Sequence, residues 1–502
     1  MSATHRLSEP RVGVRGRVRG PSRTRSCSGE TLERRTKIVA TLGPATDAPG
    51  VLDALVASGV DCVRLNCSHG AAEDLLRRAG DVRSAARRAG RPLGLLFDLQ
   101  GPKLRLAADT VERGLRPGEV VALTSGRSSG AADRVVVDYG GFARLVTERS
   151  EIVIGDGVPR LAVEGTQDGE VFARVVSAGR LAPSKGVNVT FSRPELPAIT
   201  AKDIADLEVA TRVRADFVAL SFVRSAADIE ELRARLDAHG SPARIVAKIE
   251  TVEAYENLDE IIAAADGVMV ARGDYGVTAG LARVPLMQKD TIRRTRRAGK
   301  LVITATQMLE SMIAASEPTR AEVADVANAV IDGTSAVMLS AETSVGQHPI
   351  EAVCAMSVAA EAAEESPDLR ERAQRGDVDA GPPSAAVMHA AVQLADELDA
   401  AAIVVPTATG ASARACSKHR PRQPIIALTH DPLVAEQLTL EWGVYPVVAD
   451  LARSLDELLD TALQVARDFA GLHSGDRVVI TNGQHPGAPG ATNVIIEQTL
   501  QD

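Results

Sequence analysis

The chain has 502 residues, too many for a single hydrophobic core, which predicts two to four domains. Its formal net charge of −9 argues against a nucleic-acid-binding surface, and no uncharged apolar run reaches the ~18 residues that would span a membrane. The five cysteines are scattered without a CxxC pair, which is typical of reduced thiols and indicates a cytoplasmic location.

Residues 1–35 are rich in Arg, Ser and Gly and show no apolar periodicity, so we predict a disordered basic tail. The tail has no apolar core of the kind found in secretion signals. Its shortage of acidic residues fits an organelle transit peptide, but no amphipathic helix is evident, and a non-native or extended start is the favoured interpretation.

Eight short apolar runs follow, each rich in β-branched residues or Leu, and most are followed by a segment of helical composition. Continuous apolar runs that alternate with helices indicate a parallel sheet buried on both faces. Eight such units predict an α/β fold, a TIM (β/α)₈ barrel built from residues 36–100 and 199–366. The runs lie at residues 37–43, 60–67, 92–99, 216–222, 244–250, 267–273, 301–307 and 335–340.

Two segments depart from this rhythm. Residues 101–198 alternate apolar and polar positions between turn-rich stretches, which predicts a small β-barrel domain inserted as a lid after the third barrel strand. Residues 367–502, which begin with a polar linker, predict a C-terminal α/β domain whose strands include 401–406, 424–429 and 476–481.

Polar side chains gather where the predicted barrel strands end, the usual place for the catalytic groups of a TIM barrel. In the fifth strand Lys248 and Glu250 are two residues apart, so both side chains point into the barrel mouth. A structural ion pair would explain these two alone, but a further carboxylate, Asp274, follows the sixth strand. Two carboxylates beside a phosphate-sized site favour Mg²⁺, which usually keeps several of its waters.

The segments around these positions resemble the signature blocks of the pyruvate kinase family, in the family's order, and the resemblance covers residues 36–502. It implies phosphoryl transfer from phosphoenolpyruvate to ADP, giving pyruvate and ATP in glycolysis, with Mg²⁺ or Mn²⁺ as cofactor and a homotetramer as the assembly. The blocks are RLNCSHG (64–70), AKIET (247–251), ARGDYG (271–276), ITATQMLESM (303–312), PTRAEVADVANAV (318–330) and DGTSAVMLSAET (332–343).

The resemblance also implies roles for individual residues. Lys248 and Arg64 would bind the transferring phosphoryl group, and Glu250 and Asp274 would hold the divalent ion. Thr306 would lie near the enolate carbon and help a water chain to deliver the proton that completes pyruvate. The substrate carboxylate would bind the backbone at Gly273 and Asp274.

The sequence gives weaker evidence for the residues that would bind ADP. No Walker A sequence is present, so side chains, metal and domain closure must hold the phosphates. His69 is more simply interpreted as a structural or nucleotide-contact residue than as an acid or base. The positions that the resemblance places on the ADP side are Pro44, His69, Arg105 and Lys185.

One block departs from the family pattern. Many members that need K⁺ read DTKGPEIR after the third strand, whereas this chain reads DLQGPKLR at 98–105, with Lys103 in place of Glu. A tethered ammonium can supply the charge of a bound K⁺, so we expect activity that does not require K⁺; a solvated hinge lysine is the alternative. The family's monovalent-cation site corresponds here to Asn66, Ser68, Asp98 and the carbonyl of Leu99.

The turn after the strand at 401–406 is rich in hydroxyls and glycine and opens a predicted helix, a pattern that presents backbone N–H groups to an anion. The resemblance implies that this loop and the Gly-rich segment 483–493 bind the phosphate of an allosteric effector, such as a sugar phosphate or AMP. A plain helix N-cap is the equal alternative. The loop residues are Thr407, Thr409, Gly410, Ser412 and Arg414.

Two other functions fit part of the pattern. Strand-end carboxylates alone would also suit a Mg²⁺-dependent lyase or aldolase that acts on the enolate of a 2-oxo acid. A metabolite-sensing protein without activity is a third interpretation. The inserted β domain, the Lys248–Glu250 pair and Thr306 favour phosphoryl transfer over both.

Overall fold

The computed structural model describes residues 34–126, 134–155, 157–190, 196–367, 369, 383–452, 454–483 and 492–501. Eight parallel strands form a closed barrel in the order β1-β17-β16-β15-β14-β13-β3-β2, which confirms the predicted TIM barrel and its eight strands. These strands are β1 (Lys37–Thr41), β2 (Cys62–Asn66), β3 (Gly94–Asp98), β13 (Phe217–Leu220), β14 (Arg244–Ile249), β15 (Gly267–Ala271), β16 (Leu301–Ala305) and β17 (Ala336–Leu339).

Alternate residues of each barrel strand pack on opposite faces, as the pleat requires. Ile38 and Ala40 pack outward against the helices, whereas Val39 belongs to a separate cluster that fills the barrel interior with Leu96, Val246 and other side chains. Because both faces are covered, the strands read as nearly continuous apolar runs. This explains why the sequence pattern located them.

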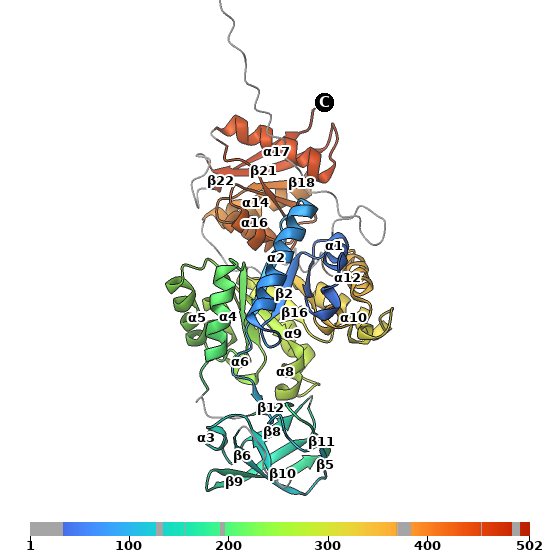
Figure 1. Ribbon diagram of the computed structural model, residues 1–502. Coiled ribbons are helices and arrows are strands. Elements are labelled where there is room, and N and C mark those ends of the chain that lie inside the picture. Colours follow the sequence, from blue (N-terminus) through green and yellow to red (C-terminus); the bar gives the residue numbers. More distant parts are fainter. Residues whose placement is uncertain are drawn as a thin grey trace, which may run out of the picture.

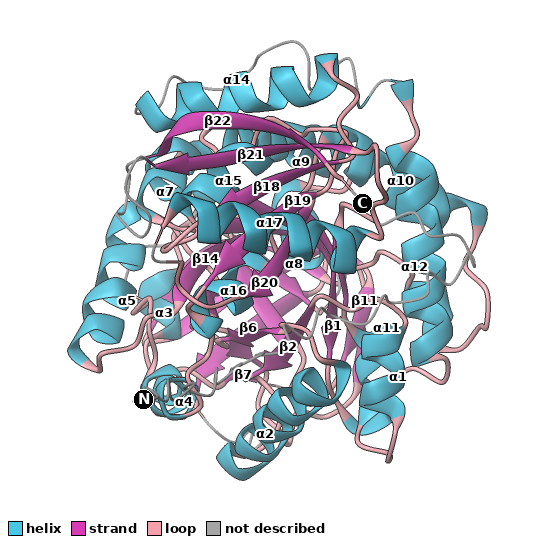
Figure 2. Cartoon of the chain, turned by 90° about the horizontal axis from the view of Figure 1, so that it is seen from above, coloured by secondary structure: helices cyan, strands magenta, loops and turns pink. Residues whose placement is uncertain are grey.

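Helices and short 3-10 turns surround the barrel (Figure 2). The motif PTRAEVADVANAV begins α10, where Thr319 and Glu322 form a reciprocal capping box. The elements are η1 (Pro44–Thr46), α1 (Val51–Ala57), α2 (Ala72–Ala89), α4 (Ala201–Arg212), α5 (Ala226–Ala238), α6 (Val252–Glu256), α7 (Leu258–Ala264), α8 (Arg272–Ala279), α9 (Val284–Arg297), η2 (Glu310–Ile313), α10 (Arg320–Asp332), α11 (Ala341–Ser344) and α12 (Pro349–Glu364).

The insertion after β3 is a β domain with its own apolar core. Its main sheet has the order β4-β12-β8-β9-β10-β6-β7, and a bridge between Leu106 and Val137 joins the two edges, so the sheet curls towards a barrel. The elements are β4 (Leu104–Arg105), β5 (Arg113–Leu115), β6 (Val120–Ser125), β7 (Val135–Val137), α3 (Phe142–Leu145), β8 (Glu151–Ile154), β9 (Arg160–Gln167), β10 (Glu170–Ser177), β11 (Gly179–Leu181) and β12 (Gly186–Val189).

The C-terminal domain is a five-stranded α/β sheet of order β20-β19-β18-β21-β22, in which only the edge strand β22 runs antiparallel. The three strands expected from sequence are present as β18, β19 and β21. The elements are α14 (Pro383–Glu397), β18 (Ala402–Pro406), α15 (Ala411–Ser417), β19 (Ile425–Thr429), α16 (Pro432–Leu438), β20 (Val444–Val448), α17 (Leu455–Ala470), β21 (Arg477–Gly483) and β22 (Thr492–Thr499).

The two added domains lie at opposite ends of the barrel (Figure 1). The inserted domain stands beside α8, where the Arg160 guanidinium donates to the carbonyl of Val277. The C-terminal domain covers the other end, and its Leu440 joins the apolar cluster inside the barrel. The mouth at the carboxyl ends of the strands is therefore the end that faces the inserted domain.

Three sequence expectations need comment. Arg34 and Arg35 were placed in the disordered tail, yet they pair with Asp61 and Glu364, so ordered structure begins by Arg34; residues 1–33 lie outside the described ranges. Cys62, Cys67 and Cys416 are free and buried, as expected of reduced thiols. In the part of the chain that the structure describes, no helix is long and apolar enough to cross a bilayer.

Two buried carboxyl groups link the barrel to the C-terminal domain. Asp216, which precedes β13, is fully buried and accepts hydrogen bonds from the Leu95 N–H and the Arg83 guanidinium. Glu436 on α16 pairs with the same guanidinium. Burial and the neighbouring Asp216 carboxylate raise the pKa of Glu436 to about 7, despite Arg83.

Because the folded-state pKa of Glu436 lies above its ordinary value, its contribution to stability is complete below about pH 4.5 and is lost as the pH rises through about 7. The melting temperature of the wild type should fall between about pH 5 and about pH 8. In Glu436→Gln, whose amide donates without ionising, this fall should be smaller. Calorimetry across that range measures it, with the exposed Glu231→Gln on α5 as control. Identical pH profiles for Glu436→Gln and wild type would contradict the raised pKa of Glu436.

Candidate functional site

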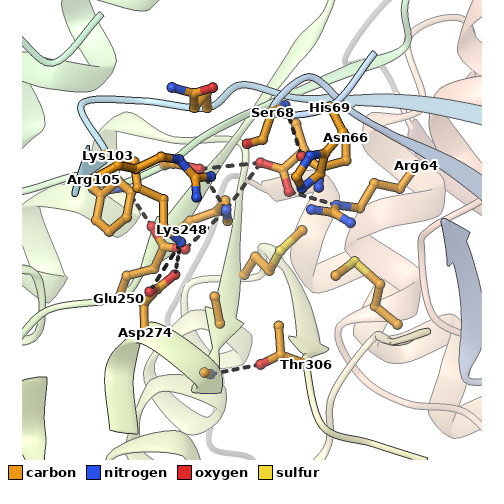
Figure 3. A pocket seen from close by; sticks show the side chains of 18 residues that line it. Arg64, Asn66, Ser68, His69, Lys103, Arg105, Lys248, Glu250, Asp274 and Thr306 are labelled. Carbon is orange, nitrogen blue, oxygen red and sulfur yellow. Dashed lines mark hydrogen bonds and ion pairs between the residues drawn. The ribbon is translucent and has the colours of Figure 1, made fainter. Parts of the chain in front are cut away.

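A cavity opens at the carboxyl ends of the barrel strands (Figure 3). It brings together most of the residues selected from sequence for the active site and the cation site, although they come from the ends of five barrel strands and from the start of the inserted domain. Of that group, three residues do not line it: Pro44, Leu99 and Lys185. The selected residues that do line it are Arg64, Asn66, Ser68, His69, Asp98, Lys103, Arg105, Lys248, Glu250, Gly273, Asp274 and Thr306.

Lys248 is at the centre of a buried charge cluster. Its ammonium lies 3.2 Å from Asp98 Oδ1 and 3.0 Å from Glu250 Oε1, and it donates to Ser221 Oγ at 2.6 Å. Burial alone would lower the pKa of Lys248, but the two carboxylates outweigh it and raise that pKa above its usual value. The side chain is therefore a permanent cation with 9% of its surface exposed, at the mouth of the barrel.

A second cation shares the Asp98 carboxylate. Arg64 Nε lies 2.7 Å from Asp98 Oδ2, and its Nη1 donates to Thr41 Oγ1 at 3.1 Å. Burial would raise the pKa of Asp98, but Lys248 and Arg64 together hold it below its ordinary value. Each oxygen of this carboxylate therefore contacts a different protein cation.

Sequence reasoning missed the turn Ser221–Phe222 after β13. Ser221 accepts from Lys248 and donates to the carbonyl of Leu99 at 2.7 Å. The Phe222 N–H donates to Glu250 Oε2 at 2.7 Å, and Phe222 has a φ of 55°, in the left-handed region. This turn thus orients both members of the Lys248–Glu250 pair. The short apolar run ending in Ser-Phe carries no sequence signal for this role, because serine at a strand end is common.

The second carboxylate of the expected metal pair has a cationic neighbour. Asp274, on the first turn of α8, lies 3.5 Å from Lys103 Nζ, which also stands 5.8 Å from the centre of the Phe222 ring. Burial and then the charges of Asp274 and Asp98 raise the pKa of Glu250, against Lys248. Glu250 and Asp274 thus repel one another across the cavity, a situation that a bound cation relieves.

Thr306 lies on the wall of the cavity next to the start of α8. Its hydroxyl accepts a hydrogen bond from the Gly273 N–H at 2.9 Å and donates to the carbonyl of Ala305 at 2.6 Å. In Figure 3 it stands on the side of the cavity away from Ser68 and His69. The structure thus brings Gly273, Asp274 and Thr306 to one wall.

The residues expected on the nucleotide side divide into two groups. His69 and Arg105 line the cavity, and burial and then the positive charges of Arg105, Arg64, Lys103 and Lys202 lower the pKa of His69. A neutral imidazole among four cations suits a polyanion such as a phosphate chain. Pro44 lies on η1, and Lys185 lies in the inserted domain with its side chain against Gly155, so both are outside the cavity.

Three of the four positions of the expected monovalent-cation site have other partners. Both oxygens of Asp98 are engaged as above, and the Leu99 carbonyl accepts from Ser221. Asn66 Oδ1 accepts from the N–H of Ser68 at 3.1 Å. The side-chain oxygens of Asp98 and Asn66 and the carbonyl oxygen of Leu99 therefore already have partners within the protein.

The expected effector loop forms a compact turn in the C-terminal domain. The Gly410 N–H donates to Thr407 Oγ1 at 2.9 Å, and Arg414 Nη2 donates to the carbonyl of Thr409 at 2.8 Å. Ser412 and Thr492 share a hydrogen bond of 2.9 Å, so the end of the second Gly-rich segment lies beside the loop. Residues 484–491 of that segment lie outside the described ranges.

Two family models match most of the chain. The model described as "Pyruvate kinase, barrel domain" matches residues 33–353, and that described as "Pyruvate kinase, alpha/beta domain" matches residues 385–496. The first match includes every candidate residue of the cavity.

Curated relatives are similar over nearly the whole length. The pyruvate kinase of Geobacillus stearothermophilus is 41% identical over 478 residues, which cover 94% of this chain and 81% of the relative. That of Methylorubrum extorquens is 41% identical over 467 residues, covering 92% and 96%. That of Mycobacterium tuberculosis is 40% identical over 471 residues, covering 92% and 98%.

Proposed function

Because the chain belongs to the pyruvate kinase family, and is thus a phosphotransferase that acts on phosphoenolpyruvate and ADP, we propose that this chemistry takes place in the cavity around Lys248. The observation that carries the proposal is the ammonium of Lys248, fixed between Asp98 and Glu250 in a cavity that Asp274 also lines. A coupled assay of pyruvate formation tests it. The same assay separates this function from a lyase or aldolase and from an inactive metabolite sensor.

Lys248 and Arg64 would stabilise the phosphoryl group during transfer. In the loose transition state of this reaction, negative charge spreads over the equatorial oxygens, and fixed cations nearby stabilise it without reorganisation. Both side chains are cationic, almost buried and anchored by the Asp98 carboxylate. They thus approach the phosphoryl group from β2 and β14, two strands separated by β3 and β13, with their orientation already set.

Glu250 and Asp274 would hold the divalent ion, Mg²⁺ or Mn²⁺. Two carboxylates that repel one another across the cavity form the donor set that such an ion prefers, with substrate oxygens and waters completing the coordination. Within the described ranges no group of three His, Cys, Asp or Glu side chains could hold a metal, which fits an ion bound jointly with its substrate. When bound, the ion would neutralise charge on the substrate's carboxylate and phosphate.

The remaining roles concern orientation and the proton. The backbone of Gly273 and Asp274 opens α8 and would bind the substrate carboxylate, as helix N-terminal N–H groups bind anions. Thr306 would stand beside the methylene carbon and help a water chain to deliver the proton. His69 and Arg105 would contact ADP directly, and Pro44 and Lys185 would reach it when the inserted domain closes.

Replacing Lys248 by Met should lower turnover by about 10²–10³ while the fold survives, because the variant removes the cation that stabilises transition-state charge. Steady-state kinetics with phosphoenolpyruvate and ADP measures the effect, and circular dichroism reports the fold. The matched control is Lys289→Met, whose ammonium pairs with Asp332 on the outside of the barrel and should leave turnover nearly unchanged. Near-wild-type turnover of Lys248→Met would reject the role.

We also propose that activity requires Mg²⁺ but not K⁺. Lys103 brings an ammonium to within 3.5 Å of Asp274, and the Asn66, Asp98 and Leu99 oxygens of the expected K⁺ site have protein partners. A tethered ammonium then supplies the positive charge that K⁺ would supply.

Wild-type turnover should accordingly change less than about two-fold when K⁺ is added to a K⁺-free assay, whereas chelation of the divalent ion should abolish it. In Lys103→Met, turnover should fall about ten-fold or more, and K⁺ should restore part of the loss, because the missing charge can then bind from solution. A large stimulation of the wild type by K⁺ would be incompatible with the proposal.

The loop Thr407–Arg414 is proposed to bind the phosphate of an allosteric effector, a sugar phosphate or AMP. Its hydroxyls and the opening turn of α15 face the end of the second Gly-rich segment. A phosphorylated metabolite at about 100 times its Kd should add about 2.7 kcal/mol of stability.

A thermal-shift panel of sugar phosphates and AMP should therefore show at least one ligand that raises the melting temperature, and Ser412→Asp should abolish the rise by charge repulsion. Ser84→Asp, at a half-buried serine on α2, is the control. No stabilisation by any member of the panel would remove this site from the proposal.

The expected homotetramer rests on the family resemblance, whereas the expected cytoplasmic location rests on the scattered cysteines. Light scattering of the purified chain gives the assembly directly, and a monomeric mass would contradict the tetramer.

A further inference from the structure

Arg272 is a buried cation that the proposed chemistry does not use. It is the first residue of α8, directly before Gly273 and Asp274, and is 8% exposed. Its side chain does not line the cavity; the guanidinium lies behind the cavity wall among Gln288, Met308 and Asp325.

The guanidinium binds three successive backbone carbonyls. Its Nε donates to the carbonyls of Ala305 at 3.3 Å and Thr306 at 3.1 Å, and its Nη2 donates to those of Thr306 at 2.6 Å and Gln307 at 3.0 Å. In an extended strand, successive carbonyls point in opposite directions. Three in a row can converge on one cation only where the chain leaves the strand geometry.

The backbone angles show this departure. Thr306 has a φ of 67° and Gln307 a φ of 54°, both in the left-handed region. A β-branched residue rarely adopts that conformation, and it persists only where the surrounding structure imposes it. Arg272 holds the backbone carbonyls of this turn, and the Gly273 N–H holds the Thr306 side chain by donating to its Oγ1 at 2.9 Å.

Asp325 on α10 orients the guanidinium. Its carboxylate pairs with Nη1, the nitrogen that donates to none of the three carbonyls. The other two nitrogens, Nε and Nη2, donate to the carbonyls of the turn. A planar fork can make both sets of contacts at once, whereas a lysine ammonium cannot reach both. Asp325 is the residue of α10 that contacts this network.

We propose that Arg272 is a positioning residue for Thr306, with Asp325 holding its guanidinium in place. The inference rests on the proposed role of Thr306 in pyruvate formation. Arg272 touches no substrate; it holds the left-handed turn that directs the Thr306 hydroxyl to the cavity wall beside Gly273. Its loss should therefore lower turnover while the KM values for phosphoenolpyruvate and ADP change little.

A double-mutant cycle tests this coupling. Arg272→Met should lower kcat by about 10²-fold, since a displaced catalytic group can cost that much, with KM values within about three-fold of wild type. Thr306→Val should lower kcat on its own. The double variant should be no slower than the slower single variant, because residues that act through one group are not additive.

Two milder variants keep the test decisive if Arg272→Met does not fold. Arg272→Lys keeps the positive charge but loses the planar guanidinium, and Asp325→Asn leaves the guanidinium without its counter-charge. Each variant should lower kcat by about three- to ten-fold. Neither should lower kcat further when it is combined with Thr306→Val. The matched control is Arg235→Met on α5, whose guanidinium pairs with Glu231 on the surface and should leave kcat unchanged.

The outcomes separate this inference from the proposed function. The inference is wrong if Thr306→Val lowers kcat but the Arg272 and Asp325 variants do not. It is also wrong if the effects of these variants on kcat multiply with that of Thr306→Val, because Arg272 then does not act through Thr306. If Thr306→Val leaves kcat at the wild-type level, the proposed role of Thr306 fails, and the inference fails with it. Loss of the Arg272 effect in the Thr306→Val background supports both.

Discussion

The site depends on one buried ammonium. Lys248 could not remain charged with 9% of its surface exposed unless nearby carboxylates offset its desolvation, and Asp98 and Glu250 do so at 3.2 and 3.0 Å. The same two carboxylates also link it to its surroundings, because Asp98 binds Arg64 and Glu250 faces Asp274. A single charge network thus joins the carboxyl ends of β2, β3 and β14 with the start of α8.

Backbone turns after the strands set the geometry of this network. Phe222 and Thr306 both adopt left-handed conformations immediately beyond a barrel strand, and each presents a polar group to the site: the Phe222 N–H to Glu250 and the Thr306 hydroxyl to the cavity wall. Such conformations are costly for non-glycine residues, at about 1–3 kcal/mol each. The buried hydrogen bonds of Glu250 and Arg272 are what retain them.

The two added domains use the ends of the barrel differently. The inserted domain stands at the open mouth, and its first residues carry Lys103 and Arg105 into the cavity. The C-terminal domain closes the other end with Leu440 in the barrel interior and Glu436 beside Asp216. Packing at that end reaches the amino end of β14 through the pair of Arg244 and Glu441, on the strand that carries Lys248 at its other end.

The amino-acid sequence by itself determined the barrel, the insertion, the C-terminal sheet and most of the cavity residues. Apolar runs buried on both faces have a pattern that no surface strand shares, and polar residues at their ends stand out against it. Only the tertiary structure decided the roles of Ser221, Phe222, Arg272 and Asp325, and excluded Pro44 and Lys185 from the cavity. The physical reason is that both properties depend on long-range packing: whether a side chain bonds to a backbone carbonyl far away in sequence, and whether a residue lies near a cleft. Neither property produces a periodic pattern in the amino-acid sequence.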